Sequence, residues 1–169
     1  MLKVLLIILM FSPVVVFAFD FKGIEIGSKT NTENIEDELG ITCRETSKAN
    51  GFYCTGDTTI AGGEASISIF LDKDYTVETI KVKFLPVNFE DVKIALLDKF
   101  GKPKLSYEET LQNVMGAEFI QQRVSWQNKT SYMYLDKYDD KIDESSLFFA
   151  TNKFSEEAEK HSQKKKGDI

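Results

Sequence analysis

Residues 64–86, EASISIFLDKDYTVETIKVKFLP, alternate between apolar and polar side chains on either side of a polar turn. Alternation with a period of two is typical of strands that bury one face, so the stretch predicts a β-hairpin that turns at residues 72–75. One face of this hairpin is apolar and carries Ile67, Ile69, Leu71, Ile80, Val82 and Phe84. Lys81 and Lys83 alternate onto the other face. We therefore expect an antiparallel sheet with helices on one face and solvent on the other.

Both cysteines lie in the stretch ITCRETSKANGFYC, residues 41–54, on either side of a turn-forming KANG. The alternation around Cys43 and Cys54 predicts two further strands, and Asn50-Gly51 supplies residues that tolerate a positive φ in the turn. The two cysteines can pair only with each other, so we expect a disulfide that staples this hairpin. A redox or metal site would need CxxC spacing or nearby histidines, which the stretch lacks.

The first residues, MLKVLLIILMFSPVVVFA, combine an early Lys3 with an apolar run that a Ser-Pro pair interrupts. This pattern predicts a secretory signal peptide over residues 1–18, cleaved after Ala18. The apolar run falls short of the ~20 residues that a membrane-spanning helix needs. We therefore expect a periplasmic or secreted chain, without stable membrane insertion after cleavage, in an oxidising compartment where a disulfide persists.

Without residues 1–18 the chain has 20 basic and 27 acidic residues, a net charge of −7 with histidine neutral. This charge disfavours nucleic acid and anionic membrane surfaces as partners. The length suits one compact domain, which we place at residues 19–154. Residues 155–169 are charged and lack an apolar face, so they predict a disordered tail or a frayed helix.

Two helices are expected among the strands. In TNTENIEDELG, Thr30 and Glu33 have the spacing of a capping box, and Gly40 is a fitting end for the helix. In NFEDVKIALLDKFGKP, Asn88 is placed to cap a longer helix with an apolar stripe, and Gly101 is placed to end it.

A third helix is predicted from Ser106, because Ser106 and Glu109 also have capping-box spacing. It would turn three apolar residues inward: Leu111, Val114 and Met115. Three more strands follow, in the stretches RVSWQN, TSYMYLDKY and SSLFFATNKF. The predicted order, β-α-β-β-β-β-α-α-β-β-β, indicates an α+β fold with an antiparallel sheet and helices packed on one face. Both halves run from helix to meander, which suggests a duplicated helix-plus-meander unit.

Few side chains in this sequence suit catalysis. The only histidine, His161, lies in the polar tail, and GxxxxGK[ST], GxGxxG and GxSxG motifs are absent, so no cofactor is implied. Carboxylates are the remaining catalytic option, and they gather at two places: Glu108 and Glu109, and then Asp136, Asp139, Asp140, Asp143 and Glu144. The second group lacks the glycine of a calcium loop, so a solvated hairpin turn is the favoured interpretation and calcium the alternative.

The candidate binding residues lie within residues 112–134. Capping of the predicted third helix explains Gln112 and Asn113, and core packing explains Trp126, which alternates inward on a strand. The alternative is a groove that holds a peptide or glycan, lined by Gln112, Asn113, Trp126, Tyr132 and Tyr134. Large apolar residues also fall on both faces of the last two strands: Tyr132, Tyr134, Phe148 and Phe149. A half-solvated sheet would expose some of them, and exposed aromatic residues mark contact surfaces.

Four segments resemble a family of small exported proteins of Gram-negative bacteria: ALLDKFGKP (95–103), QNVMGAEF (112–119), Trp126 and IDESSLFFAT (142–151). In that family a KYGKP-like helix end precedes QN-x-MGA-x-F, a strand tryptophan and an ID-x-S-x-L strand. The resemblance implies a periplasmic location and no particular activity. In outline the layout is also similar to the helix-plus-meander folds of the assembly lipoprotein BamE and of β-lactamase inhibitory proteins, an analogy of fold alone. The absence of a lipobox cysteine counts against the lipoprotein.

These observations predict a non-enzymatic binding or inhibitory protein of the cell envelope, whose partner is another envelope protein or a peptide or glycan. A carboxylate enzyme that acts on cell-wall glycans is the first alternative, and it requires two acids that converge in a cleft. A purely structural envelope protein is the second.

Overall fold

The computed structural model describes residues 18–46, 50–112 and 115–156. Residues 1–17 of the predicted signal peptide and residues 157–169 of the predicted tail lie outside this part of the chain, as do Asn113 and Val114.

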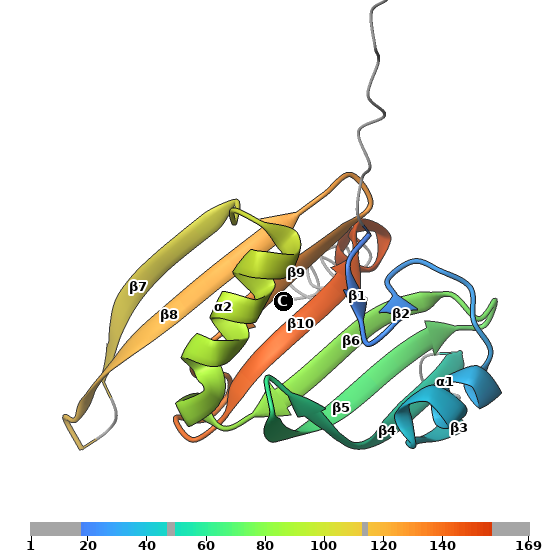
Figure 1. The fold of residues 1–169 in the computed structure, drawn as a ribbon, viewed down its shortest axis with the longest axis horizontal. Coiled ribbons are helices and arrows are strands. Elements are labelled where there is room, and N and C mark those ends of the chain that lie inside the picture. Colours follow the sequence, from blue (N-terminus) through green and yellow to red (C-terminus); the bar gives the residue numbers. More distant parts are fainter. Residues whose placement is uncertain (1–17, 47–49, 113–114, 157–169) are drawn as a thin grey trace, which may run out of the picture.

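The fold is α+β, with an eight-stranded antiparallel sheet in the order β3-β4-β5-β6-β10-β9-β8-β7 (Figure 1). Its strands are β3 (Thr42–Thr46), β4 (Gly51–Ile60), β5 (Gly63–Asp72), β6 (Val77–Phe84), β7 (Leu105–Gln112), β8 (Glu118–Gln127), β9 (Ser131–Asp136) and β10 (Ser145–Thr151). The helices are α1 (Thr32–Leu39) and α2 (Phe89–Phe100), with a 3₁₀ turn at Pro86–Asn88 before α2. The predicted first strand is instead a small hairpin of β1 (Asp20–Phe21) and β2 (Ile24–Glu25).

Each half of the sheet follows a helix. Helix α1 precedes the meander β3-β4-β5-β6, helix α2 precedes β7-β8-β9-β10, and the last strands of the two meanders, β6 and β10, pair with each other. The predicted helix-plus-meander unit therefore occurs twice in the architecture. The two halves meet edge to edge in one continuous sheet (Figure 1).

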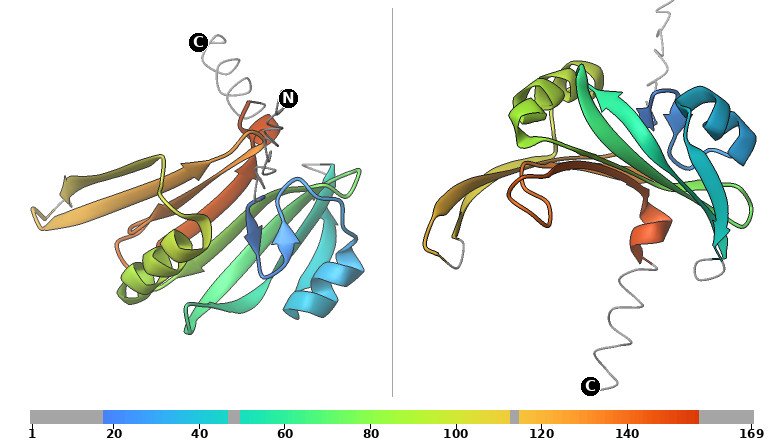
Figure 2. Two further views of the ribbon diagram at one scale, coloured as in Figure 1. Left: turned by 45° about the horizontal axis from the view of Figure 1, so that its top comes forward. Right: turned by 90° about the horizontal axis from the view of Figure 1, so that it is seen from below.

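Both helices lie on the same face of the sheet, as the sequence predicts (Figure 2). The sheet arches so that the helices cover its convex side, and the concave side is free of α1, α2 and the β1–β2 hairpin. We call this concave side the open face. A short helical turn at residues 152–156 and the β9–β10 loop, residues 137–144, lie at its margins.

The core lies between the convex side and the helices, where apolar side chains of neighbouring strands stand in register. Ile67, Val82 and Leu147 form one cross-strand row. Ile69, Ile80 and Phe149 form the next. All six are buried, whereas Lys81 and Lys83 alternate to the open face and stay partly exposed. The hairpin predicted from residues 64–86 is confirmed.

The two predicted helices form, but both N-terminal caps differ from the prediction. Helix α1 begins after Asn31, whose side-chain oxygen accepts a hydrogen bond from the Asn34 amide at 2.7 Å, so the predicted Thr30–Glu33 box is wrong. Asn88 occupies the cap position of α2 without a side-chain capping bond, because the preceding 3₁₀ turn already leads the chain into the helix. The C-terminal predictions are confirmed, since Gly40 and Gly101 end their helices with positive φ.

The helix predicted from Ser106 is wrong, because this segment is strand β7, paired with β8 from Leu105↔Ser125 to Gln112↔Glu118. Its apolar residues do not enter a core: Leu111 is 37% exposed and Met115 is 89% exposed. Packing against a core favours either the helical or the strand spacing of apolar residues, and a segment without a buried face lacks this constraint. The backbone groups of β8 need a hydrogen-bonding partner, and β7 supplies it.

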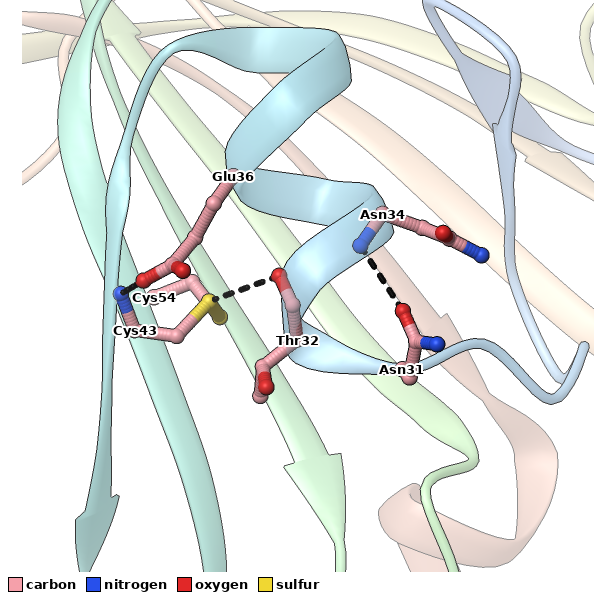
Figure 3. Close-up of a disulfide and its surroundings, with 6 residues drawn as sticks. All are labelled: Asn31, Thr32, Asn34, Glu36, Cys43 and Cys54. Atoms are coloured by element: carbon pink, nitrogen blue, oxygen red, sulfur yellow. Dashed lines mark hydrogen bonds between the residues drawn. A yellow bond between two sulfur atoms is a disulfide. The ribbon is translucent and has the colours of Figure 1, made fainter.

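The cysteine hairpin forms as predicted. Cys43 and Cys54 face each other across β3 and β4 and are joined by a disulfide (Figure 3). Helix α1 lies beside the bridge, and the Glu36 carboxylate accepts a hydrogen bond from the Cys43 amide at 2.6 Å. Asn50 has the expected positive φ of 49°, but Gly51 lies in extended strand β4. There a Cβ would come within 2.1 Å of the Leu71 carbonyl oxygen, so glycine is needed for close strand packing.

We predict that the double substitution Cys43→Ala/Cys54→Ala lowers the free energy of unfolding by about 3 kcal/mol, because the bridge restricts the unfolded chain. Urea unfolding of the oxidised protein and of the double variant measures the difference. The wild-type protein in reductant is the matched control and should unfold like the variant. Equal stability with and without reductant would contradict the prediction.

Candidate functional site

Three aromatic side chains from the last two strands meet on the open face. The Tyr134 and Phe148 ring centroids are 5.1 Å apart, those of Tyr132 and Phe148 are 6.2 Å apart, and those of Tyr132 and Tyr134 are 6.4 Å apart with nearly parallel planes. We call Tyr132, Tyr134 and Phe148 the aromatic cluster. All three are only partly buried.

Strand register assembles this cluster. Phe148 lies opposite Tyr134 and Ala150 lies opposite Tyr132, so the three rings fall on one face while Met133, Leu135 and Phe149 fall on the other. Phe149 is 1% exposed and belongs to the core. Of the four residues from which we expected some exposed rings, Tyr132, Tyr134 and Phe148 lie on the open face and are partly exposed, whereas Phe149 is buried.

A charged pair borders the cluster on the β8 side. Arg123 Nε and Nη2 donate to the two carboxylate oxygens of Asp136 at 2.5 and 2.9 Å, and Arg123 Nη1 donates to the Tyr107 hydroxyl at 3.0 Å. Asp136 is 3% exposed. Its hydrogen bonds raise the pKa of Arg123 above the ordinary value. A bidentate pair of this kind fixes the guanidinium in one orientation. No pattern along the chain predicts this pair, because the contact depends on the register of β8 and β9.

Lysine–acid pairs border the cluster on the β6 side, where the β9–β10 loop folds against the sheet. Lys81 Nζ lies 2.7 Å from an Asp139 oxygen, and Lys83 Nζ lies 2.5 Å from a Glu144 oxygen. The hydrogen bond that Lys83 donates to Glu144 raises the pKa of Lys83. Three acids of the candidate calcium segment are thus engaged with Arg123, Lys81 and Lys83. Within the described part of the chain no group of three or more His, Cys, Asp or Glu side chains is placed to hold a metal ion.

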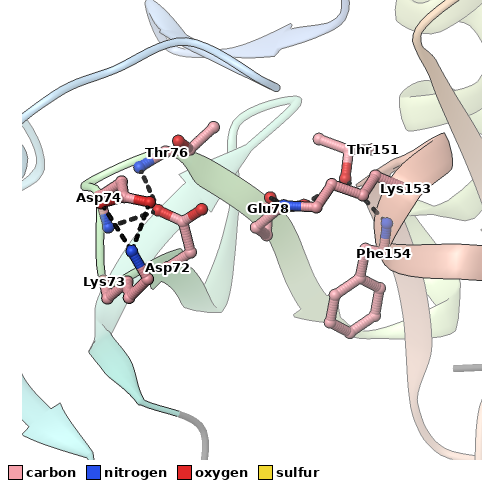
Figure 4. Close-up of polar contacts among 8 residues, drawn as sticks. All are labelled: Asp72, Lys73, Asp74, Thr76, Glu78, Thr151, Lys153 and Phe154. Atoms are coloured by element: carbon pink, nitrogen blue, oxygen red, sulfur yellow. Dashed lines mark hydrogen bonds and ion pairs between the residues drawn. The ribbon is translucent and has the colours of Figure 1, made fainter. Parts of the chain in front are cut away.

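A hollow of about 630 Å³ adjoins the aromatic cluster at Tyr132. Its walls come from β7, β8 and β9 and from the helical turn at residues 152–156. Thr151 holds this turn: its hydroxyl accepts a hydrogen bond from the Phe154 amide at 3.1 Å and donates to the buried Glu78 carboxylate (Figure 4). Asn152 adds a backbone bond to the Thr130 carbonyl at 2.9 Å.

The structure brings only some of the five predicted groove residues together, since Trp126 and Tyr132 both line the hollow. Trp126 points to the core side, is 3% exposed and donates its indole N–H to the Gly101 carbonyl at 2.9 Å, so the packing interpretation is confirmed. Gln112 lies at the far end of the β7–β8 hairpin and donates to the Gly116 carbonyl. Asn113 lies outside the described residues. Tyr132 and Tyr134 alone of the five lie in the aromatic cluster.

Acidic side chains gather around a second hollow, of about 310 Å³, at the opposite end of the open face. Asp57, Glu64, Asp143 and Glu144 line it together with Lys83. Glu144 is already paired with Lys83. The predicted Glu108 and Glu109 pair lies elsewhere, on β7, where strand alternation directs the two carboxylates to opposite faces of the sheet.

We predict that Tyr134 ionises at a higher pH than an ordinary tyrosine. Burial, and secondarily the Asp136 charge, raises the pKa of Tyr134 from 10.0 to about 12. The folded state therefore holds this proton more tightly than the unfolded state, and the resulting stability is present below pH 10 and lost as the pH rises toward about 12.

Tyrosinate difference absorbance, recorded with circular dichroism to confirm folding, checks this titration. Tyr134→Phe should remove the step of highest pKa, and Tyr75→Phe at an exposed turn is the control. Loss of an ordinary step near pH 10 on Tyr134→Phe would show that the ring is freely solvated.

No helix in residues 18–46, 50–112 or 115–156 is long and apolar enough to cross a membrane. No protein-family model, curated protein or solved structure matches this chain. The resemblance to small exported proteins therefore stays a prediction.

Proposed function

We propose that this protein is an exported, non-enzymatic binding module of the cell envelope that holds a partner protein against its open face. The observation that carries the proposal is the aromatic cluster: Tyr132, Tyr134 and Phe148 meet on the side of the sheet that lacks α1 and α2. The solvated face of an antiparallel sheet is ordinarily polar.

The cluster has the chemistry of an interface centre. Tyrosine and phenylalanine offer large apolar surfaces with little rotamer entropy, and tyrosine and arginine are enriched among residues that dominate binding energy. Burying a partly exposed ring against a partner removes apolar area from water at about 25 cal/mol per Å². Three rings in contact form one continuous target for such burial.

The surroundings of the cluster suit recognition of a shaped partner. Arg123 on one side and Lys81 and Lys83 on the other are held by acids of the same face, so the polar groups are fixed before binding. Preorganised groups lose less entropy on association. The concave arch of the sheet complements a convex surface or an inserted loop.

Export rests on two features that agree. The first residues predict a signal peptide, and the Cys43–Cys54 disulfide is stable in an oxidising compartment such as the periplasm. A carboxylate enzyme acting on glycans remains the alternative, and the acid-lined hollow at Asp57 and Glu64 is where it would have to act.

A photoreactive phenylalanine analogue placed at Tyr134, in the protein expressed in its own envelope, tests the proposal. We expect a discrete crosslinked species at this position, because the partner covers the ring. Ile94 is the matched control, since it is exposed on α2 on the opposite side of the sheet. The same substitution at Ile94 should give no such species.

Crosslinking that is equal at both positions, or absent at both, would contradict binding through the open face. Phe148→Ala in the Tyr134-labelled protein provides a second readout. It should lower the crosslinked fraction severalfold while circular dichroism stays unchanged, because it removes a third of the cluster without touching the core.

A further inference from the structure

We infer that the free edge of the sheet, strand β7, is a second binding site, and that it takes an extended polypeptide segment with two adjacent basic residues as a ninth strand. The site is separate from the aromatic cluster on the open face and does not depend on it. Strand β7 differs from the other edge of the sheet in its exposure and in its charge.

The two edge strands of the sheet differ in length and in whether a side chain bonds to their outward-facing backbone groups. Strand β3, Thr42–Thr46, is the shorter edge strand. Its outward-facing Cys43 amide donates a hydrogen bond to the Glu36 carboxylate of α1 at 2.6 Å (Figure 3). A side chain that satisfies an edge amide blocks the addition of another strand there. Strand β7 is the other edge, and its eight residues extend beyond α2 (Figure 1).

Strand β7 is open along its length. Every residue from Leu105 to Gln112 is exposed except Tyr107, which is partly buried. In an antiparallel strand bonded on one side, every second N–H and C=O points outward. Those of β7 form a row of unsatisfied backbone groups of the kind that a partner strand pairs with.

The strand is already held in the conformation that binding requires. Eight consecutive residues pair with β8. Tyr107, at the middle of the strand, accepts a hydrogen bond from Arg123, which Asp136 in turn fixes. A partner therefore meets a preformed template, and only the added segment loses conformational entropy on binding.

The charge of β7 indicates which kind of peptide strand it would bind. Glu108 and Glu109 are adjacent, so one carboxylate lies on each face of the sheet at the centre of β7. Glu109 has no polar partner in the described part of the chain, and Glu108 accepts a single bond from Gln122 at 2.8 Å. Opposite charges directly across two strands stabilise their pairing. Two adjacent basic residues on the added strand would meet one carboxylate on each face.

The same charges argue against a second copy of this chain as the occupant. Antiparallel pairing of two β7 strands about their centre would place Glu108 of one copy opposite Glu109 of the other, twice. Like charges directly opposite each other destabilise strand pairing. Exposed charges of this kind are a common protection of edge strands against self-association.

Amide hydrogen exchange measured by NMR tests the inference, with the capped peptide Thr-Val-Lys-Lys-Val-Thr as the probe. We expect the peptide to slow exchange at alternate β7 amides and to leave β3 unchanged. The matched peptide Thr-Val-Glu-Glu-Val-Thr should bind about tenfold more weakly, since both cross-strand pairs become repulsive. In the variant Glu108→Lys/Glu109→Lys this preference should reverse, and the exposed positions make loss of folding unexpected.

Three outcomes would overturn the inference. One is unchanged exchange along β7 at saturating peptide. Another is a response confined to Tyr132, Tyr134 and Phe148, which would assign the peptide to the open face. The third is a concentration-dependent dimer of the free protein with β7 protected, which would make a second copy the occupant. Failure of β7 to bind leaves crosslinking through Tyr134 unaffected, so the two proposals are separable.

Discussion

The pairing of β6 with β10 joins the two halves of the sheet and sets which side chains face the core. The other pairs in the eight-stranded sheet join strands that follow one another in the chain, whereas this pair joins the two halves. It spans six residue pairs, from Ser145↔Phe84 to Ala150↔Thr79. Ile80 faces Phe149 and Val82 faces Leu147 on the core side, and burial of each such side chain contributes about 1.5–3 kcal/mol.

This register also sets the chemistry of the open face. Because side chains alternate, the pairing that buries Ile80 against Phe149 places Phe148 beside Lys81 and Ser146 beside Lys83. The lysines come from the first half of the chain, while the acids that hold them, Asp139 and Glu144, come from the second. A shift by one residue would move the core residues to solvent and the charges into the core. The aromatic cluster and its charged border therefore follow from one strand pairing.

The sequence predicted the parts of the fold that have one buried face. Apolar side chains recur at every second position through much of residues 64–84 because one side packs on helices and the other is solvated, and the stripe of α2 is clear for the same reason. Strand β7 was predicted as a helix because capping-box spacing at Ser106 and Glu109 is a local signal. At an exposed edge, the pairing with β8 decides the conformation instead. Tertiary pairing overrides local propensity at such positions.

The candidate site was accessible to sequence reasoning only in part. Large residues on both faces of YMYL and LFF indicated exposed aromatic residues, but the meeting of Tyr134 with Phe148 depends on the β9–β10 register. Trp126 and Gln112 were included because they belong to the motif of the family resemblance, and the sheet places them apart. The Arg123–Asp136 pair depends on the register of β8 against β9, which no local pattern reveals.

A partner that covers the open face in the cell would shield the aromatic cluster from hydroxyl radicals, so footprinting in the native envelope detects it. Oxidation of Tyr134 and Phe148 should be several times lower in intact envelopes than in the purified protein. Oxidation of Ile94 and Leu97, which are exposed on α2, should be the same in both. Equal oxidation of the aromatic cluster in the two preparations would contradict the account.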